Sequence, residues 1–191
     1  MIFHIKHRWY TALFATVIGG LLSWQLGAWN HLVKSALPLS AQIGLGILAG
    51  LLSIGLDGAL HEIFKRTLGH VYTEAFRQYA HKVLDGMRWP AYITGGLMAA
   101  LAEEPFFRGV LLPAFDRNVI GVTIAALVFA ACHWLRLSFI LFWFWAVLEG
   151  VLFGVLMVAT HSLLVPMIAH GIHDLVGYSV LRTIIRRDAS A

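Results

Sequence analysis

The sequence predicts an all-α protein, a polytopic helical bundle that crosses a membrane about six times and carries one amphipathic helix at the cytoplasmic interface. Two observations lead to this prediction. Hydrophobic residues make up 59% of the 191 residues and charged residues only 13%, against roughly 45–50% and about 25% in soluble domains. The apolar residues also fall in long blocks separated by short charged stretches, which is the pattern of membrane-spanning helices. This composition excludes a water-soluble globule and a disordered chain.

Six apolar blocks are candidates for spans. They are residues 10–29, 39–60, 91–115, 119–135, 138–160 and 163–181. None alternates with the period of two that a transmembrane β-strand requires, and backbone hydrogen bonding inside lipid then requires helices. The first block is too long for a signal peptide and ends in Trp24 and Trp29, so we expect an uncleaved span. We expect residues 1–191 to form one membrane domain.

Positive charge predicts the orientation of these spans. With a cytoplasmic N-terminus, eleven of the fourteen Lys and Arg residues lie on the cytoplasmic side, while Lys34 and Arg117 lie outside and Arg108 lies within a span. Because cytoplasmic loops are enriched in Lys and Arg, we expect a multi-pass cell-membrane protein with both termini in the cytoplasm. Anionic lipid facing these loops accounts for the net charge of +4. No basic motif of a nucleic-acid reader is present, so the expected partner is the lipid bilayer and not nucleic acid.

The one long connection, residues 61–90, has the pattern of an amphipathic helix. Its apolar residues, from Phe64 to Met87, recur every three or four positions with basic residues between them. We expect an interfacial helix over residues 62–87 on the cytoplasmic surface, ended by Pro90 before the next span. A structural strut is the favoured role, and guidance of a substrate is the alternative.

Ionisable residues inside the spans are the main functional signal, because each costs at least ~2.5 kcal/mol on insertion scales and therefore needs a partner or a role. Glu104 and Arg108 are four residues apart on one helical face and can form an ion pair. Glu103 points elsewhere and is free to act as a general base. Pro105 kinks the helix or begins a new one. Either case leaves backbone near Glu103 open to water or ligand.

Three histidines follow in later blocks. His133 comes one helical turn after Phe129, and His170 and Asp174 are again four residues apart on one face. His173 lies about 60° away from His170 around the helix. Together with Glu103, these residues place a carboxylate, a histidine and a second histidine with an acid on three helices. That set of groups is typical of hydrolytic sites.

The order of these patterns resembles the CPBP intramembrane proteases, also called the Abi or type II CAAX prenyl endopeptidase family. The family has three motifs, Glu-Glu-x-x-x-Arg, Phe-x-x-x-His and His-x-x-x-Asn or Asp. In this chain they stand as Glu103-Glu104-Pro-Phe-Phe-Arg108, Phe129-Ala-Ala-Cys-His133 and His170-Gly-Ile-His-Asp174. The resemblance covers about residues 91–181. The departures are Pro105 inside the first motif and Asp174 where many members have Asn.

The resemblance implies hydrolysis of a peptide bond in a membrane-associated protein or peptide, within or beside the membrane. It assigns roles to three pairs of residues: Glu103 with His133 to activate the attacking water, Glu104 with Arg108 to hold the first motif in shape, and His170 with Asp174 to stabilise the tetrahedral oxyanion. Because an ionised Asp174 would repel that oxyanion, it must be protonated or must act by orienting His170. The family suggests CAAX-type processing or bacteriocin maturation and self-immunity as substrate classes.

A metal cofactor is an alternative for the same groups, because members are often named metalloproteases. Glu103, His133 and His170 could supply three ligands to Zn²⁺ and leave a fourth position for water. However, no His-Glu-x-x-His helix exists, since His61-Glu62 is followed by Ile, Phe and Lys. We favour a glutamate-activated water without an obligatory metal.

Two other functions compete with proteolysis. One is a catalytically inactive membrane immunity or scaffold protein of the same fold, and the intact motifs argue against it. The other is a proton or ion carrier that uses Asp57, Glu149 and the histidines. Glycines in the second block, from Gly44 to Gly58, would suit a carrier that packs closely or bends, but glycine at helix contacts is the commoner explanation.

The depth of Glu103 raises a difficulty. If block 91–115 enters from the cytoplasm, Glu103 lies about 18 Å into the membrane, whereas His133 lies near the inner end of block 119–135. Straight, full-length spans would keep the two side chains apart. We therefore expect either that residues 91–102 are not all at hydrocarbon depth, or that the helix breaks at Glu103-Glu104-Pro105. In either case a water-filled cavity opens to the cytoplasm.

Overall fold

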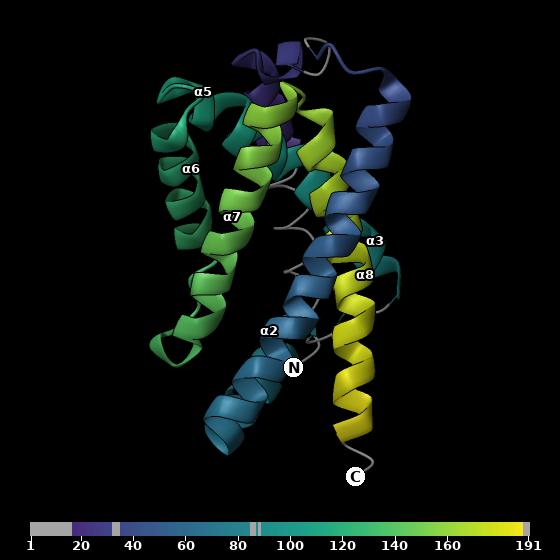
Figure 1. Cartoon of the computed structure of the whole chain (residues 1–191), viewed down its shortest axis with the longest axis vertical. Coiled ribbons are helices and arrows are strands. Elements are labelled where there is room, and N and C mark those ends of the chain that lie inside the picture. Colours follow the sequence, from purple (N-terminus) through teal and green to yellow (C-terminus); the bar gives the residue numbers. More distant parts are fainter. Residues whose placement is uncertain (1–16, 32–34, 85–86, 88, 189–191) are drawn as a thin grey trace.

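A computed structural model describes residues 17–31, 35–84, 87 and 89–188 as a helical bundle. It contains no strand in these ranges, which confirms the predicted all-α class. Helices α2 and α8 run side by side, and α6 and α7 form the other side of the bundle (Figure 1). The first part of the predicted span 10–29 lies outside the described residues, and residues 17–25 are helical.

The elements follow one another through short connections. They are η1 (Ala28–His31), α2 (Leu39–Leu84), α3 (Trp89–Met98), η2 (Ala99–Glu103), α4 (Glu104–Phe106), η3 (Phe107–Leu111), α5 (Leu112–Ala114), α6 (Val119–Cys132), η4 (Leu137–Phe139), α7 (Ile140–Thr160) and α8 (Leu164–Asp188). Three described stretches are long and apolar enough to cross a membrane: Leu39–Leu84, Leu137–Thr160 and Leu164–Arg186. The count of six spans stays a prediction.

Helix α2 joins the predicted second span to the predicted interfacial helix, and it folds back on itself at Gly69. The backbone of Gly69 has φ 56° and ψ −130°, a conformation that glycine adopts readily. In a straight helix His61 and Tyr72 would lie about 16 Å apart along the axis, yet His61 Nδ1 and Tyr72 Oη form a hydrogen bond of 2.9 Å. The structure therefore places the boundary between these segments at Gly69, and the second arm returns beside the first.

The predicted third span is one helical stretch from Trp89 to Ala114 that contains two π-helical turns, η2 and η3. Pro105 follows η2 closely, and Pro113 follows η3. Because proline has no N–H and its ring crowds the carbonyl group four residues earlier, the wider π turn accommodates each ring. The helix thus does not break at Glu103-Glu104-Pro105, where the backbone stays right-handed helical.

Helix α6 is shorter than the predicted span 119–135. Asn118 caps its start by accepting hydrogen bonds from the backbone N–H groups of Ile120 and Gly121. The helix ends at Cys132, with His133 as its C-cap. Its 14 residues extend about 21 Å, less than the ~30 Å of a hydrocarbon core. The end of α6 therefore lies beside the middle of the Trp89–Ala114 stretch, where Phe129 contacts Phe107.

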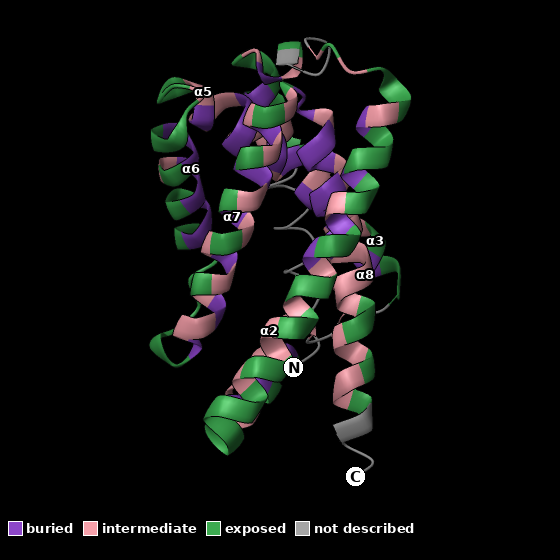
Figure 2. Cartoon of the chain, in the orientation of Figure 1, coloured by how far each residue is buried: buried purple, intermediate pink, exposed green. Residues whose placement is uncertain are grey.

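Helix α8 is central, since it packs against α2, α3 and α7. Two glycines of α2 allow the close approach to α8. A Cβ atom at Gly46 would lie 2.7 Å from Ile168 Cβ, and one at Gly50 would lie 2.6 Å from the Ala169 carbonyl oxygen. Small residues at helix contacts let membrane helices pack closely. Figure 2 shows the buried residues gathered where these helices converge.

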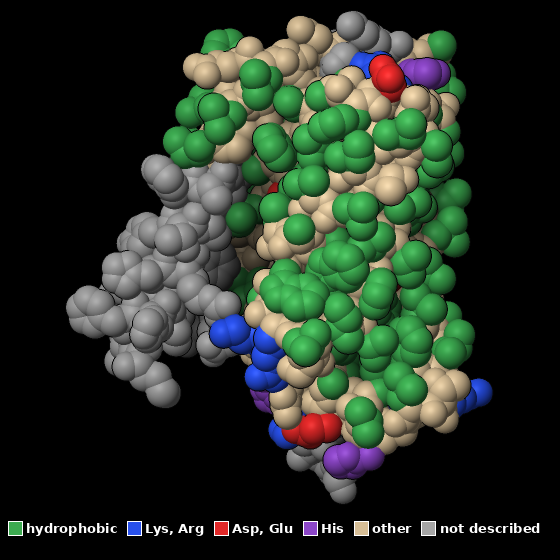
Figure 3. Space-filling model, turned by 90° about the vertical axis from the view of Figure 1, so that its left-hand side faces the viewer, with side chains coloured by type: hydrophobic (Ala, Val, Ile, Leu, Met, Phe, Trp, Pro, Cys, Tyr) green, Lys and Arg blue, Asp and Glu red, His purple; other side chains and the backbone are tan. Residues whose placement is uncertain are grey.

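The outer surface is apolar over its middle. In Figure 3, hydrophobic side chains cover the middle of one face, and charged and histidine side chains gather near its two ends. Among the exposed side chains are Leu48, Leu52 and Leu56 of α2, which are 53%, 64% and 50% exposed. A continuous apolar band of this kind requires lipid around it. The chain is a membrane protein.

Candidate active site

Glu104 and Arg108 form a fully buried ion pair, as their spacing predicted. Arg108 Nη1 lies 2.7 Å from Glu104 Oε1, and both side chains are 0% exposed. Arg108 Nη2 also donates to the carbonyl oxygen of Gly150 at 3.1 Å, and the guanidinium lies 4.8 Å from the centre of the Phe129 ring. Opposite charges that pair in this way offset much of the cost of burial, although Glu104 Oε2 and Arg108 Nε have no hydrogen-bond partner in the described ranges. The pair ties the Trp89–Ala114 stretch to α6 and α7.

His170 of α8 shares the same carboxylate. Its Nδ1 lies 2.7 Å from Glu104 Oε1, and because an ionised carboxylate only accepts hydrogen bonds, Nδ1 carries a hydrogen. Its Nε2 faces Asp174, whose Oδ1 is 3.8 Å away. Phe153 stacks on the His170 ring with centroids 4.6 Å apart. The ring is therefore fixed between two acidic side chains.

Glu103 and His133 face each other across a short gap, with Glu103 Oε2 3.9 Å from His133 Nε2. His133 Nδ1 donates to the carbonyl oxygen of Phe129 at 2.8 Å, so Nε2 of the neutral ring is an acceptor. The gap is too long for a direct hydrogen bond, and Glu103 Oε2 is buried with no hydrogen-bond partner in the described part of the chain. Two acceptors across such a gap suit a water molecule that donates to both.

Asp174 connects the two histidines of α8. Its Oδ2 accepts a hydrogen bond of 3.1 Å from Tyr178 Oη. Its Oδ1 lies 3.2 Å from His173 Nδ1 and 3.8 Å from His170 Nε2. An acidic side chain that contacts three groups in this way can orient both imidazole rings.

A cavity of about 420 Å³ adjoins these groups. Its wall includes His133, His170 and Asp174, together with Asp57 and Glu149 and several aromatic side chains. A mostly apolar cavity with a few convergent polar groups is typical of ligand sites. Glu103 does not line the cavity, but it faces His133, which does.

The structure thus brings the six predicted catalytic residues into one connected group. They are Glu103, Glu104, Arg108, His133, His170 and Asp174. The Phe129 ring contacts both histidines, with its centre 4.3 Å from that of His133 and 5.7 Å from that of His170. The Phe-x-x-x-His pattern therefore supplies the packing that holds this group together. The catalytic roles stay predictions.

Comparison with known proteins points to the same region. Residues 85–176, slightly less than half of the chain, match the sequence model of a family described as type II CAAX prenyl endopeptidase Rce1-like. This segment is similar to the Rce1-like family. The Rce1-like segment contains all six predicted catalytic residues.

A curated relative also matches the chain. It is the uncharacterised protein YpbD of Bacillus subtilis (strain 168), 37% identical over 108 residues, which are 56% of this chain and 54% of that protein. The chain spans about half the length of this relative. No solved structure gives a significant match.

One set of side chains in the described ranges is arranged closely enough for a metal ion. The ligand atoms of Asp57, Glu149 and His173 all lie within 4.8 Å of one another. The metal ligands predicted within the Rce1-like segment, Glu103, His133 and His170, are not gathered in this way. His170 Nδ1 is engaged with Glu104. A metal at that predicted set stays a prediction.

Sequence reasoning did not connect Asp57 and Glu149 to the site. Asp57 lies on α2, outside the Rce1-like segment, and Glu149 lies on α7 within it. Both contact His173 Nε2 at 2.7 Å. The available signal was their position in apolar blocks, where an acidic residue requires a partner. The sequence patterns assigned no role to His173, which lies about 60° around the helix from His170.

Proposed function

We propose that this chain is an intramembrane endopeptidase that hydrolyses a peptide bond in a membrane-associated protein or peptide. The observation that carries the proposal is the pair of acceptors, Glu103 Oε2 and His133 Nε2, that face each other at 3.9 Å. A water molecule between them can be oriented by one acceptor and deprotonated by the other. The family description supports the same class of reaction.

In the proposed first step, Glu103 takes a proton from this water while His133 holds it through Nε2. The oxygen of the water bonds to the carbonyl carbon of the scissile peptide, and the electron pair of the C=O bond moves to the carbonyl oxygen. The tetrahedral intermediate then breaks its C–N bond. Glu103 returns the proton to the leaving nitrogen, which gives a carboxylic acid and an amine.

The oxyanion of that intermediate requires a nearby donor, and His170 is positioned to supply it. Glu104 accepts a hydrogen bond from Nδ1 at 2.7 Å, and Asp174 lies 3.8 Å from Nε2. Two flanking acidic groups favour a ring that carries hydrogen on both nitrogens, so Nε2 can donate to the oxyanion. In this proposal Asp174 acts by orienting His170, as Tyr178 and His173 orient Asp174.

The substrate class that the family description supports is a prenylated C-terminal CAAX tail. Such a tail carries its apolar prenyl group in the membrane, and the cavity wall includes the apolar side chains of Phe142, Trp143 and Ala146. We place both termini and the CAAX tail on the cytoplasmic side of a multi-pass bundle. This orientation follows the distribution of Lys and Arg.

Peptide release from intact membranes tests this proposal. Membranes from cells that produce the chain and from cells that produce Glu103→Gln are incubated under the same conditions, and the newly formed peptide termini are compared by mass spectrometry. We expect termini that form only with the unchanged chain. Identical termini in both samples would indicate a catalytically inactive membrane scaffold.

A further inference from the structure

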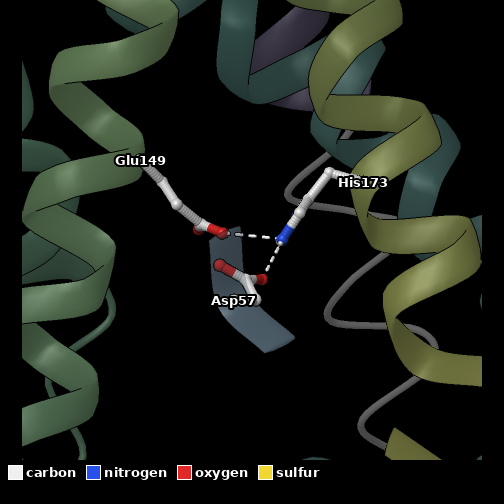
Figure 4. A group of neighbouring side chains, drawn as sticks. All are labelled: Asp57, Glu149 and His173. Carbon is white, nitrogen blue, oxygen red and sulfur yellow. Dashed lines mark hydrogen bonds and ion pairs between the residues drawn. The ribbon is translucent and has the colours of Figure 1, made fainter. Parts of the chain in front are cut away.

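A second group of ionisable side chains lies at the cavity, and two of its three members, Asp57 and Glu149, have no part in the proposed hydrolysis. Asp57 of α2, Glu149 of α7 and His173 of α8 point toward one another from three helices (Figure 4). His173 Nε2 lies 2.7 Å from Asp57 Oδ2 and 2.7 Å from Glu149 Oε1. The side chains are only 27%, 16% and 11% exposed, so this is not a solvated acidic surface.

One linear hydrogen bond accounts for only one of these two contacts. An imidazole nitrogen has either one hydrogen or one lone pair, yet Nε2 of His173 has two carboxylate oxygens at 2.7 Å. The other ring nitrogen, Nδ1, lies 3.2 Å from Asp174 Oδ1 and has an acceptor there for a hydrogen. In the neutral ring Nε2 then directs its lone pair at two carboxylates. The nitrogen and the two carboxylate oxygens therefore share one positive charge, which either a proton on Nε2 or a bound metal ion supplies.

The surrounding side chains orient two of these three groups, Asp57 and His173, as a metal site does. Trp145 Nε1 donates a hydrogen bond to Asp57 Oδ1, which leaves Oδ2 for the centre of the group. The carboxylate of Asp174 holds the far nitrogen of His173. Ligating histidines almost always give their second N–H to such an acceptor, which fixes the ring and its tautomer.

We propose that Asp57, Glu149 and His173 bind one Zn²⁺ ion, at a site separate from the Glu103–His133 pair. Carboxylate oxygens and imidazole nitrogens are both ligands of Zn²⁺ in proteins. Two negative charges, a neutral ring and Zn²⁺ sum to zero, which removes most of the penalty for burying the acids within the membrane. All three residues line the cavity, and water there completes the coordination. Through His173 the ion also fixes Asp174.

Zinc retention by the purified full-length chain in detergent tests this proposal. The protein is stripped with a chelator, loaded with Zn²⁺ alone, freed of excess ion and analysed for metal content by mass spectrometry. We expect one Zn²⁺ per chain, and an affinity at least ~10-fold lower in Glu149→Gln and in His173→Gln. Co²⁺ in place of Zn²⁺ should give the visible absorption of a low-symmetry site. Glu149→Gln should lose that absorption.

Two further variants separate loss of the site from misfolding. Trp145→Phe keeps an aromatic ring but removes the donor to Asp57, and we expect it to weaken Zn²⁺ affinity about 10-fold. Phe144→Leu is the control on the same helix, since the Phe144 side chain is 54% exposed, and it should bind Zn²⁺ as the unchanged chain does.

His133→Ala distinguishes the two candidate metal sites and should retain one Zn²⁺ while losing peptide cleavage. An unchanged chain that retains no Zn²⁺ would overturn the proposal. Release of the ion by His133→Ala, or full affinity in both Glu149→Gln and Trp145→Phe, would overturn it as well. Because metal content is measured without a substrate, failure of this proposal is distinct from failure of the proposed hydrolysis.

Discussion

Glu103 Oε2 lies 3.9 Å from His133 Nε2. Glu103 belongs to η2, and His133 caps the end of α6. The contact forms because α6 ends at Cys132, part-way along its neighbour, so that its C-cap residue faces the first π-helical turn of the Trp89–Ala114 stretch. π-helical turns often occur at functional sites. Because α6 is short, Glu103 and His133 come close together although the helix that carries Glu103 is unbroken.

Replacement of Glu103 by Gln should remove the base without changing the shape of the site. We expect the cleavage rate to fall by about 10²–10⁴-fold, the usual contribution of a general base, with unchanged thermal unfolding in detergent. The control is Glu62→Gln, since Glu62 is 52% exposed in its pair with Arg66. Equal rates for Glu103→Gln and the unchanged chain would remove Glu103 from the mechanism.

The Glu104–Arg108 pair should be important for stability. Arg108→Met leaves the buried Glu104 carboxylate without its cation, and we expect a loss of about 3–5 kcal/mol in unfolding free energy. Thermal or denaturant unfolding in detergent measures it. Arg77→Met is the matched control because Arg77 pairs with Glu74 at the surface, where ion pairs contribute little. If the two variants unfold alike, the buried pair has no special structural role.

Replacement of Asp174 by Asn should be tolerated better than replacement by an apolar residue. Asn keeps an oxygen that accepts from Tyr178, so Asp174→Asn should retain cleavage within about 10-fold, whereas Asp174→Leu should lose about 10²–10³-fold through misorientation of the oxyanion donor His170. Initial rates at saturating substrate measure both effects. An Asn variant as inactive as the Leu variant would show that the negative charge of Asp174 is required.

The packing of α2 on α8 gives a stability test. A Cβ atom at Gly50 would lie 2.6 Å from the Ala169 carbonyl oxygen, whereas one at Gly44 would meet nothing within 4 Å. We expect Gly50→Ala to lose about 1–3 kcal/mol through overpacking, and Gly44→Ala to be neutral or to gain up to ~1 kcal/mol from helix propensity. The unfolding free energies of the two variants are compared in detergent. A larger loss for Gly44→Ala than for Gly50→Ala would show that α2 does not pack against α8 at Gly50.

Local spacing predicted part of the site. Residues four apart in a helix lie on one face, and this rule placed Arg108 beside Glu104 and His170 near Asp174. The hydrophobic blocks predicted the helical class because lipid leaves the backbone few alternatives. Helix contacts explain the glycines of the second block only at Gly46 and Gly50, because a Cβ atom at Gly44, Gly55 or Gly58 would meet nothing within 4 Å.

The remaining features depend on contacts between distant segments. Nothing local marks Cys132 as the end of α6, because the apolar pattern continues to Leu135. The reversal at Gly69 interrupts an amphipathic pattern that continues unchanged on both sides. The contact between Asp57 and His173 joins residues far apart in the chain, which no periodicity can pair.

The most direct test uses the purified chain in lipid vesicles with a farnesylated peptide that ends in a CAAX sequence. Mass spectrometry follows release of the C-terminal tripeptide by the unchanged chain, by Glu103→Gln and by Glu62→Gln. We predict release with the unchanged chain and with Glu62→Gln, and a rate at least ~10²-fold lower with Glu103→Gln. Release by Glu103→Gln at the unchanged rate, or no release by any of the three, would contradict hydrolysis of such a tail by a water held between Glu103 and His133.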